Sequence, residues 1–273
     1  MKLHLVPART GLQWVKLGVK TFFRQPLAMS GLFFMFMATV SVLSLVPLLG
    51  TVIALLLVPV ATLGLMAATR EATQGRFPMP SALISGLRGK PAQTRNMLIL
   101  GAMYAAGLLL VLGAATLFAG DAPPPLDPAA GDVSAELVRA SLANQGLLAG
   151  LVVYLPVVMA FWHAPALVHW HGVSPGKSLF FSFMACWGNK GAMLFYGLGW
   201  LGVFMLVGLF MSVLGALLGG VEALNFVLYP AVLFMASMFH TSIYFTFVDS
   251  FDLAERPTST AATTPSPTTG EDA

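Results

Sequence analysis

The sequence predicts an all-α, polytopic membrane protein, a transmembrane helical bundle with about six spans. Of its residues, 57% are hydrophobic and only 9% are charged, whereas soluble globular domains carry about 25% charged residues. The apolar residues gather into six stretches, each near the roughly 20 residues that a helix needs to cross a hydrocarbon core. Too few charged side chains are available to cover a soluble globule, so we expect most of the surface to face lipid.

Residues 1–26 are predicted to form an amphipathic helix that lies in the membrane interface. Lys16, Lys20 and Arg24 share one face, and the face beside it is apolar: Leu12, Val15, Val19, Phe22 and Phe23. Such a helix places its apolar side in the acyl boundary and its cations among anionic headgroups. The alternative is a soluble helix that binds a protein partner. We favour the interface because an apolar span follows directly.

The six predicted spans follow one another along the chain: Leu27–Val46, Gly50–Thr69, Met97–Ala119, Leu147–Val168, Gly191–Leu218 and Leu224–Val248. The first is expected to be retained, because its apolar run has no convincing signal-peptide cleavage site. Only a short, uncharged turn around Pro47 separates it from the second. The two form either two full crossings or a tight hairpin that does not fully cross, and their lengths favour full crossing.

The distribution of Lys and Arg predicts that both termini lie in the cytoplasm. Thirteen of the 14 cations fall before the first span, between spans two and three, between spans four and five, or after span six. Arg139 is the exception, in a segment with several acidic residues. Loops rich in Lys and Arg stay on the cytoplasmic side of a membrane. We therefore expect a six-span transmembrane domain over residues 1–253, and a disordered cytoplasmic tail over residues 254–273, where Thr, Pro and Ser dominate.

Three prolines suggest a threefold internal repeat: Pro59, Pro156 and Pro230 lie in the second, fourth and sixth spans. Pro59 precedes Gly75 by the same interval that separates Pro156 from Gly172. The unit would be an interfacial segment, a span, a turn and a proline-containing span, in three parallel copies. The alternative is chance, since prolines are common in membrane helices. In either case each proline removes a backbone donor and is expected to kink its helix.

Histidines form the candidate polar cluster of the spans: His163, His169, His171 and His240. No Asp, Glu, Lys or Arg lies well inside a predicted span, which argues against a proton-coupled transporter, because intramembrane charges usually mark ion pathways. The histidines either bind a ligand or a metal, or pack between helices. A metal site needs three or four convergent ligands, whereas His169 and His171 diverge by about 200° on a helix. We therefore expect helix packing, with neither a metal nor a cofactor.

Two segments carry a family resemblance. They read Val6-Pro7-Ala8-Arg9 through Phe22-Phe23-Arg24-Gln25-Pro26-Leu27, and Phe161-Trp162-His163-Ala164-Pro165 through His169-Trp170-His171-Gly172. These segments resemble an uncharacterised family of six-span inner-membrane proteins from betaproteobacteria. The resemblance covers about residues 1–253 and implies location and architecture, without an activity or catalytic residues. A more distant likeness is to the membrane region attached to some bacterial glycerophosphodiester phosphodiesterases. We expect no transfer of that activity, because the sequence continues into no phosphodiesterase domain.

The expected function is a non-catalytic accessory or organiser of membrane components, with membrane lipids, and anionic headgroups at the cytoplasmic face in particular, as partners. The alternative is a carrier or channel for a lipid-like or small neutral solute. An enzyme ranks third, because the sequence has no His-Glu-x-x-His zinc helix and no glycine loop with the spacing of a phosphate-binding loop. Nucleic-acid binding is not expected, since the cations flank apolar runs and form no basic soluble module.

Overall fold

The computed structural model of the protein describes residues 2–47, 49–119, 144–217 and 221–251, with the backbone alone at 221–226. The predicted tail, residues 254–273, lies outside this range. The described elements are the 3-10 helix η1 (Pro80–Leu87) and these α-helices: α1 (Thr10–Phe22), α2 (Pro26–Ser44), α3 (Leu49–Thr73), α4 (Pro91–Leu117), α6 (Gln145–Phe161), α7 (Ala164–Trp170), α8 (Pro175–Gly188), α9 (Lys190–Leu217) and α10 (Val221–Ser250).

Six helical segments are long and apolar enough to cross a membrane: Pro26–Ser44, Leu49–Thr73, Pro91–Leu117, Gln145–Trp170, Lys190–Leu217 and Val227–Ser250. They confirm the six predicted spans and the all-α class. In lipid every backbone polar group needs a partner, and a helix provides these partners within its own segment.

The fourth span differs from the prediction, because it is interrupted between α6 and α7. Pro165 stands near the start of α7; it has no N–H for the carbonyl of Phe161, and its ring would clash with that carbonyl. The backbone N–H of His163, in the break, donates instead to the hydroxyl of Ser182 at 2.9 Å. By contrast, α3, α6 and α10 continue as helices through Pro59, Pro156 and Pro230. A kink at these three prolines stays a prediction.

The elements follow a threefold order of one short helix and two long ones. The units are α1, α2 and α3; then η1, α4 and α6 with α7; then α8, α9 and α10. Gly75 and Gly172, the equally spaced glycines, both adopt a positive φ, 75° and 64°, just after α3 and α7. Such a left-handed residue commonly ends a helix, and glycine adopts it without a steric cost. The equal spacing therefore corresponds to the same helix end in two units.

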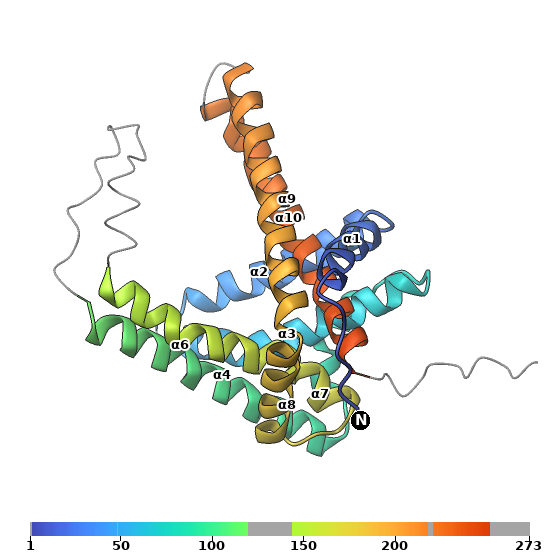
Figure 1. The fold of residues 1–273 in the computed structure, drawn as a ribbon, viewed down its shortest axis with the longest axis vertical. Coiled ribbons are helices and arrows are strands. Elements are labelled where there is room, and N and C mark those ends of the chain that lie inside the picture. The colour runs from blue at the N-terminus through green and yellow to red at the C-terminus, as the bar shows by residue number, and fades with distance from the viewer. Residues whose placement is uncertain (1, 48, 120–143, 218–220, 252–273) are drawn as a thin grey trace, which may run out of the picture.

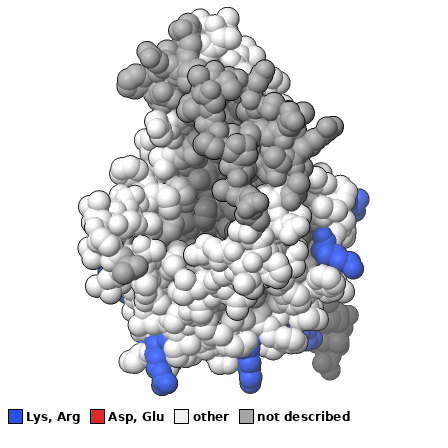
Figure 2. All heavy atoms as spheres, turned by 90° about the vertical axis from the view of Figure 1, so that its left-hand side faces the viewer, with Lys and Arg blue, Asp and Glu red and all other residues white. Residues whose placement is uncertain are grey.

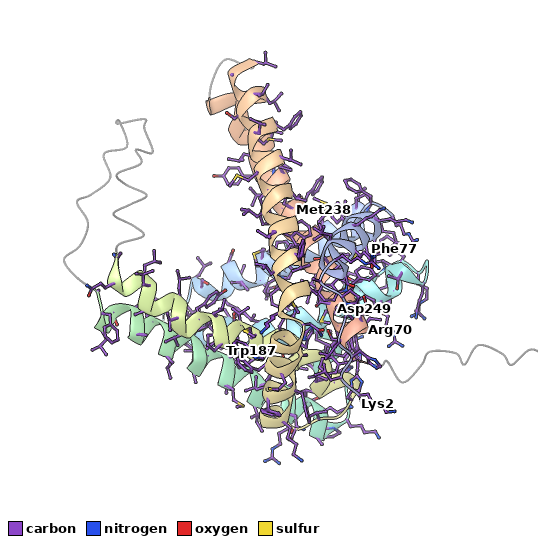
Figure 3. All side chains as sticks on the ribbon, viewed as in Figure 1. Lys2, Arg70, Phe77, Trp187, Met238 and Asp249 are labelled. Carbon is purple, nitrogen blue, oxygen red and sulfur yellow. The ribbon has the colours of Figure 1, made fainter. Side chains whose placement is uncertain are left out.

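The short helices connect the three units into a ring. Each packs against the hairpin of the preceding unit: η1 on α3, α8 on α6, and α1 on both α9 and α10. Figure 1 shows the long helices diverging from this base, with α9 and α10 in one direction and α4 and α6 in another. Along the diverging part of α9 and α10, apolar side chains project outward and are exposed (Figure 3), as expected of a lipid-facing surface.

The N-terminal segment lies beside the end of α10. Leu3 forms an isolated antiparallel bridge with Phe251, and the backbone N–H of His4 donates to the carbonyl of Ser250 at 3.0 Å. Asn189 holds the same segment, because it accepts from the N–H of Val6 at 2.9 Å and donates to the carbonyl of His4 at 3.1 Å. The N-terminal segment and the end of the sixth span are therefore on the same side of the bundle.

A helix is present near the N-terminus as α1, and the residues of its predicted apolar face are divided, because Val15 and Phe22 are buried against the protein. Leu12 and Phe23 are 47% and 65% exposed, and the buried face contains Trp14 and two glycines. A Cβ atom at Gly11 would collide with the backbone carbonyl of Ala192, and one at Gly18 with Ser242. The close approach of α1 to α9 and α10 needs these glycines, and a hydrophobic pattern gives glycine no weight.

The cations occupy a limited part of the surface. In the face that Figure 2 shows, Lys and Arg side chains lie along the lower edge and one flank, and the described surface above them is uncharged. Lys16 and Lys20 on α1, and Arg24 just after it, are exposed. On this face, cations along an edge and a flank beside a wide uncharged surface match a protein that crosses a membrane.

Candidate functional site: a cavity among the three proline-containing helices

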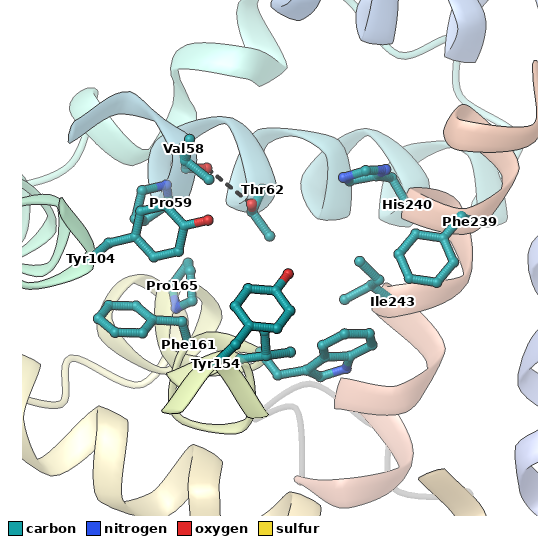
Figure 4. Close-up of a pocket in the computed structure, with 12 residues that line it drawn as sticks. Val58, Pro59, Thr62, Tyr104, Tyr154, Phe161, Pro165, Phe239, His240 and Ile243 are labelled. Atoms are coloured by element: carbon teal, nitrogen blue, oxygen red, sulfur yellow. Dashed lines mark hydrogen bonds between the residues drawn. The ribbon is translucent and has the colours of Figure 1, made fainter. Parts of the chain in front are cut away.

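A cavity of about 210 Å³ lies where the three units meet (Figure 4). Its walls come from α3, α4, α6, α7 and α10, so all three proline-containing spans contribute. The residues that line it are Val58, Pro59, Thr62, Tyr104, Tyr154, Val158, Phe161, Trp162, Pro165, Phe239, His240 and Ile243. Of the three predicted kink residues, the cavity wall therefore includes Pro59.

The cavity is uncharged but carries several hydroxyl groups. None of the described lining residues is Asp, Glu, Lys or Arg. The hydroxyl of Thr62 donates to the carbonyl of Val58 at 2.9 Å, which leaves its oxygen lone pairs available. The phenolic hydroxyls of Tyr104 and Tyr154 point into the same space (Figure 4). Within the part of the chain that the structure describes, neither phenol has a hydrogen-bond partner.

His240 supplies the nitrogen on the other side of the cavity. Its Nδ1 lies 2.8 Å from the carbonyl of Ala236. A carbonyl can only accept, so Nδ1 carries the proton and Nε2 of the neutral ring is an acceptor. The ring packs against Phe33 and Phe239, with centroids 5.0 and 5.7 Å away. His240 is thus the one predicted histidine that lines this cavity.

The ring of His163 is fully buried and belongs to a hydrogen-bond network beside the cavity, which shares Trp162 with the cavity wall. The Thr246 hydroxyl donates to the carbonyl of Ile243 at 2.7 Å. The hydroxyl therefore accepts from His163 Nε2 at 3.1 Å and from Trp162 Nε1 at 3.0 Å. Nδ1 of His163 is 3.9 Å from the sulfur of Cys186. These contacts connect the break in the fourth span to α8 and α10.

The proximity of Cys186 to a histidine does not create a reactive thiol. Burial raises the pKa of the Cys186 thiol to about 12, because a thiolate loses its hydration in an apolar surrounding. The thiol also lies 3.6 Å from the carbonyl of Met159. A nucleophilic cysteine needs a lowered pKa, so this pair is part of the packed interior.

The two remaining histidines lie near the end of α7, away from the cavity. The carbonyl of His169 accepts from the side chain of Gln93 at 3.2 Å. The His171 ring packs on Phe247 and Phe251, with centroids 5.7 and 6.5 Å away. The structure therefore does not gather the four histidines into one site. Among the described residues, no group of three His, Cys, Asp or Glu side chains could hold a metal.

Residues 172–176, after α7, read Gly-x-Ser-x-Gly, the sequence of a hydrolase nucleophile elbow. That motif acts on a sharp turn from a strand to a helix. Here the segment joins two helices, and Ser174 precedes α8, whose residue Ser178 donates its N–H to the Ser174 carbonyl at 2.9 Å. The segment therefore lacks the sharp strand-to-helix turn that presents the nucleophilic serine in hydrolases.

The sequence analysis also missed the hydroxyls of the cavity. Tyr154 and Tyr229 both stand one or two residues before a repeated proline. Tyr154 faces the cavity, whereas Tyr229 is 77% exposed on the lipid side of α10. A tyrosine just before a repeated proline therefore faces the cavity in one helix and the outside in another. The packing of the helices, not the local sequence, decides between the two.

Six membrane-length helical segments, four of which line an uncharged cavity, define a polytopic α-helical membrane protein. Over 260 residues the chain is 36% identical to a probable inner membrane protein of Burkholderia thailandensis, and the match covers 93% of this chain and 96% of that relative. The chain belongs to this family of multi-pass bacterial inner-membrane proteins, as the resemblance predicted. No family model and no solved structure matches the chain.

Proposed function

We propose that the protein is a non-catalytic accessory or organiser of membrane components, and that it holds a neutral, lipid-like molecule in the cavity among α3, α6 and α10. The observation that carries the proposal is the lining of this cavity. It combines aromatic walls with two phenols that have no partner within the described chain and contains no charged residue among its described lining. These hydroxyls are partly exposed to the cavity, and each can both donate and accept, so a ligand that enters the cavity can form hydrogen bonds with them.

The position of the cavity favours a ligand that comes from the bilayer. Its walls are spanning helices, and Tyr154 is 43% exposed, so one side opens toward the surroundings of the helices. A charged ligand would lose its hydration there without an opposite charge to compensate. A neutral amphiphile can enter laterally from lipid and leave its apolar part outside.

The exposed side of α1 supports a second contact with the membrane. Lys16, Lys20 and Arg24 are exposed beside Leu12 and Phe23, a combination that suits the boundary between anionic headgroups and acyl chains. In this proposal α1 and both termini lie on the cytoplasmic side, and anionic lipids gather around the base of the bundle.

Lipid identification after purification in mild detergent tests the proposal. We expect a neutral lipid to co-purify with the wild type and to be lost from Thr62→Phe, because the larger ring occupies the cavity. Thr116→Phe is the matched control, since Thr116 is exposed on α4 and makes the same type of bond to the carbonyl four residues earlier. Equal amounts of neutral lipid in both variants, each with wild-type thermal stability, would contradict the proposal.

A carrier or channel for such a molecule is the second candidate, and the prolines favour it. Pro59, Pro156 and Pro230 each lie inside a helix that lines the cavity. A proline weakens a helix locally and provides a hinge, so the cavity could open to alternate sides. Flux of the co-purified lipid in proteoliposomes separates the two candidates, because an organiser binds the lipid without accelerating its transfer between leaflets.

A further inference from the structure

We infer that the cavity binds a quinol-type lipid, that is, a flat aromatic ring with a hydroxyl group at each of two ends and an apolar tail. This inference rests on the proposed function, since it names the class of neutral molecule that the cavity holds. It follows from the arrangement of donors and acceptors, the aromatic walls and the volume.

The polar groups of the cavity are arranged at two ends. At one end the hydroxyls of Tyr104 and Tyr154 point toward the same space, and His240 lies across from them (Figure 4). The phenols can donate, whereas Nε2 of His240 can only accept because Nδ1 is bonded to Ala236. A matching ligand accepts at one end and donates at the other. A quinol does both, because each of its hydroxyls has a lone pair and a proton.

The walls between these two ends suit a flat ring. Phe161 stands edge-on to Tyr104, with centroids 5.2 Å apart, and Phe239 stands edge-on to Trp162 at 6.1 Å. The indole N–H of Trp162 donates to Thr246, so Trp162 presents a satisfied, largely apolar ring to the cavity. Aromatic rings prefer stacked or edge-to-face neighbours, which a diacylglycerol headgroup cannot supply.

The volume limits the ligand to a single ring. The cavity of about 210 Å³ equals the share of roughly seven water molecules in the liquid. One substituted ring fits this space, whereas a long apolar tail does not and has to leave by the open side near Tyr154. A ring inside the protein and a tail in lipid is the geometry that a membrane quinol requires.

Calorimetric titration of the detergent-solubilised protein with a short-tailed benzoquinol, kept reduced without oxygen, tests this inference. We expect the dissociation constant to rise about 3- to 10-fold in Tyr104→Phe and in Tyr154→Phe, the change that corresponds to one neutral hydrogen bond. Tyr229→Phe, on the lipid side of α10, is the matched control and should bind as the wild type does.

The oxidised form of the same ring provides the second measurement. A quinone cannot donate to His240, so we expect it to bind about 3- to 10-fold more weakly than the quinol. In His240→Leu this preference should disappear. Equal binding of both forms to the wild type, or equal binding in all three tyrosine variants, would overturn the inference.

A parallel titration with a short-chain diacylglycerol separates failure of this inference from failure of the proposed function. If diacylglycerol binds and its binding depends on Tyr104 and Tyr154, the cavity holds a neutral lipid of another class, and only the quinol is rejected. If the quinol, the quinone and the diacylglycerol all fail to bind, both this inference and the proposed function are rejected. Purified wild-type protein that retains the quinol and loses it in Thr62→Phe is the outcome that we expect.

Discussion

At the scale of single residues, the second half of α10 explains how the bundle is held together. Its polar side chains each bind a different element: Ser242 accepts from Tyr196 at 2.7 Å and Trp200 at 3.1 Å, and Asp249 accepts from Trp14 at 2.7 Å. Inside a membrane protein apolar packing does not distinguish protein from lipid, so hydrogen bonds and close packing specify the contacts. The hydroxyls of α10 are therefore structural.

The bond between Trp14 and Asp249 makes a residue-level prediction. Trp14→Phe removes the indole N–H while it keeps an aromatic ring, and Asp249 then loses a donor in a partly buried site. We expect the free energy of unfolding to fall by about 1–3 kcal/mol. Thermal unfolding in detergent measures this loss, and Trp187→Phe, an exposed position on α8, should leave the midpoint unchanged.

His163 and His240 should respond differently to substitution. His163→Ala removes a fully buried ring that donates to Thr246, so we expect a stability loss of about 2–5 kcal/mol. His240→Ala should mainly weaken binding in the cavity. Neither substitution should change the metal content, which we expect to be well below one ion per chain by elemental analysis. A stoichiometric metal that either substitution removes would refute this assignment.

At the scale of the elements, the sequence predicted which segments cross the membrane but not which side of each helix faces inward. A spanning helix must be apolar around its whole circumference, because lipid and protein interior are equally apolar. Tyr104 and Tyr154 could therefore not be placed in a cavity from their spacing. Pro59 and His240 were singled out for their chemistry, and helix packing determines that both line one cavity. The break before α7 was also missed, because the hydrophobic run continues through it.

The helix α1 makes a prediction at this scale. Replacing Lys16, Lys20 and Arg24 together by Gln removes the cations from its exposed side and leaves its buried face intact. Each basic residue near an anionic surface contributes about 1 kcal/mol. In nanodiscs, the wild type should gain thermal stability from anionic lipid relative to neutral lipid, and the variant should lose most of this gain. High salt should reduce the wild-type gain; a gain that salt and the substitutions leave unchanged would show that α1 has no electrostatic role.

At the scale of the whole molecule, the bridge from Leu3 to Phe251 places the N-terminal segment and the end of the sixth span on one side. The distribution of Lys and Arg predicts that this side is cytoplasmic. In a Cys186→Ser background, a cysteine at Ser134 should react with an impermeant reagent in spheroplasts, and one at Ser81 only after lysis. Ser81 is exposed on η1, so burial would not explain its protection in spheroplasts. The reverse pattern would invert the topology.

The threefold order could be proposed from three prolines and two glycines, but the ring that the units form could not. Each short helix contacts the preceding unit through residues that are distant in the sequence, and no local sequence pattern predicts such contacts. Gly11 and Gly18 allow one such contact, the close approach of α1 to α9 and α10. They cannot be recognised from the sequence, because the chain has 27 glycines.

Ring closure by α1 also sets an order of events during biosynthesis. The helix α1 leaves the ribosome before the later spans. Asp249, which accepts from Trp14 of α1, and Ser250, which accepts from His4, are made only with the sixth span. Gly11 lacks its neighbour Ala192 until the fifth span is made, whereas Gly18 lacks Ser242 and the indole of Trp14 lacks Asp249 until the sixth span is made. Before then the lipid boundary can hold the helix by its exposed side. We therefore expect α1 to stay at the membrane surface during synthesis and to pack against the bundle only when the sixth span is complete.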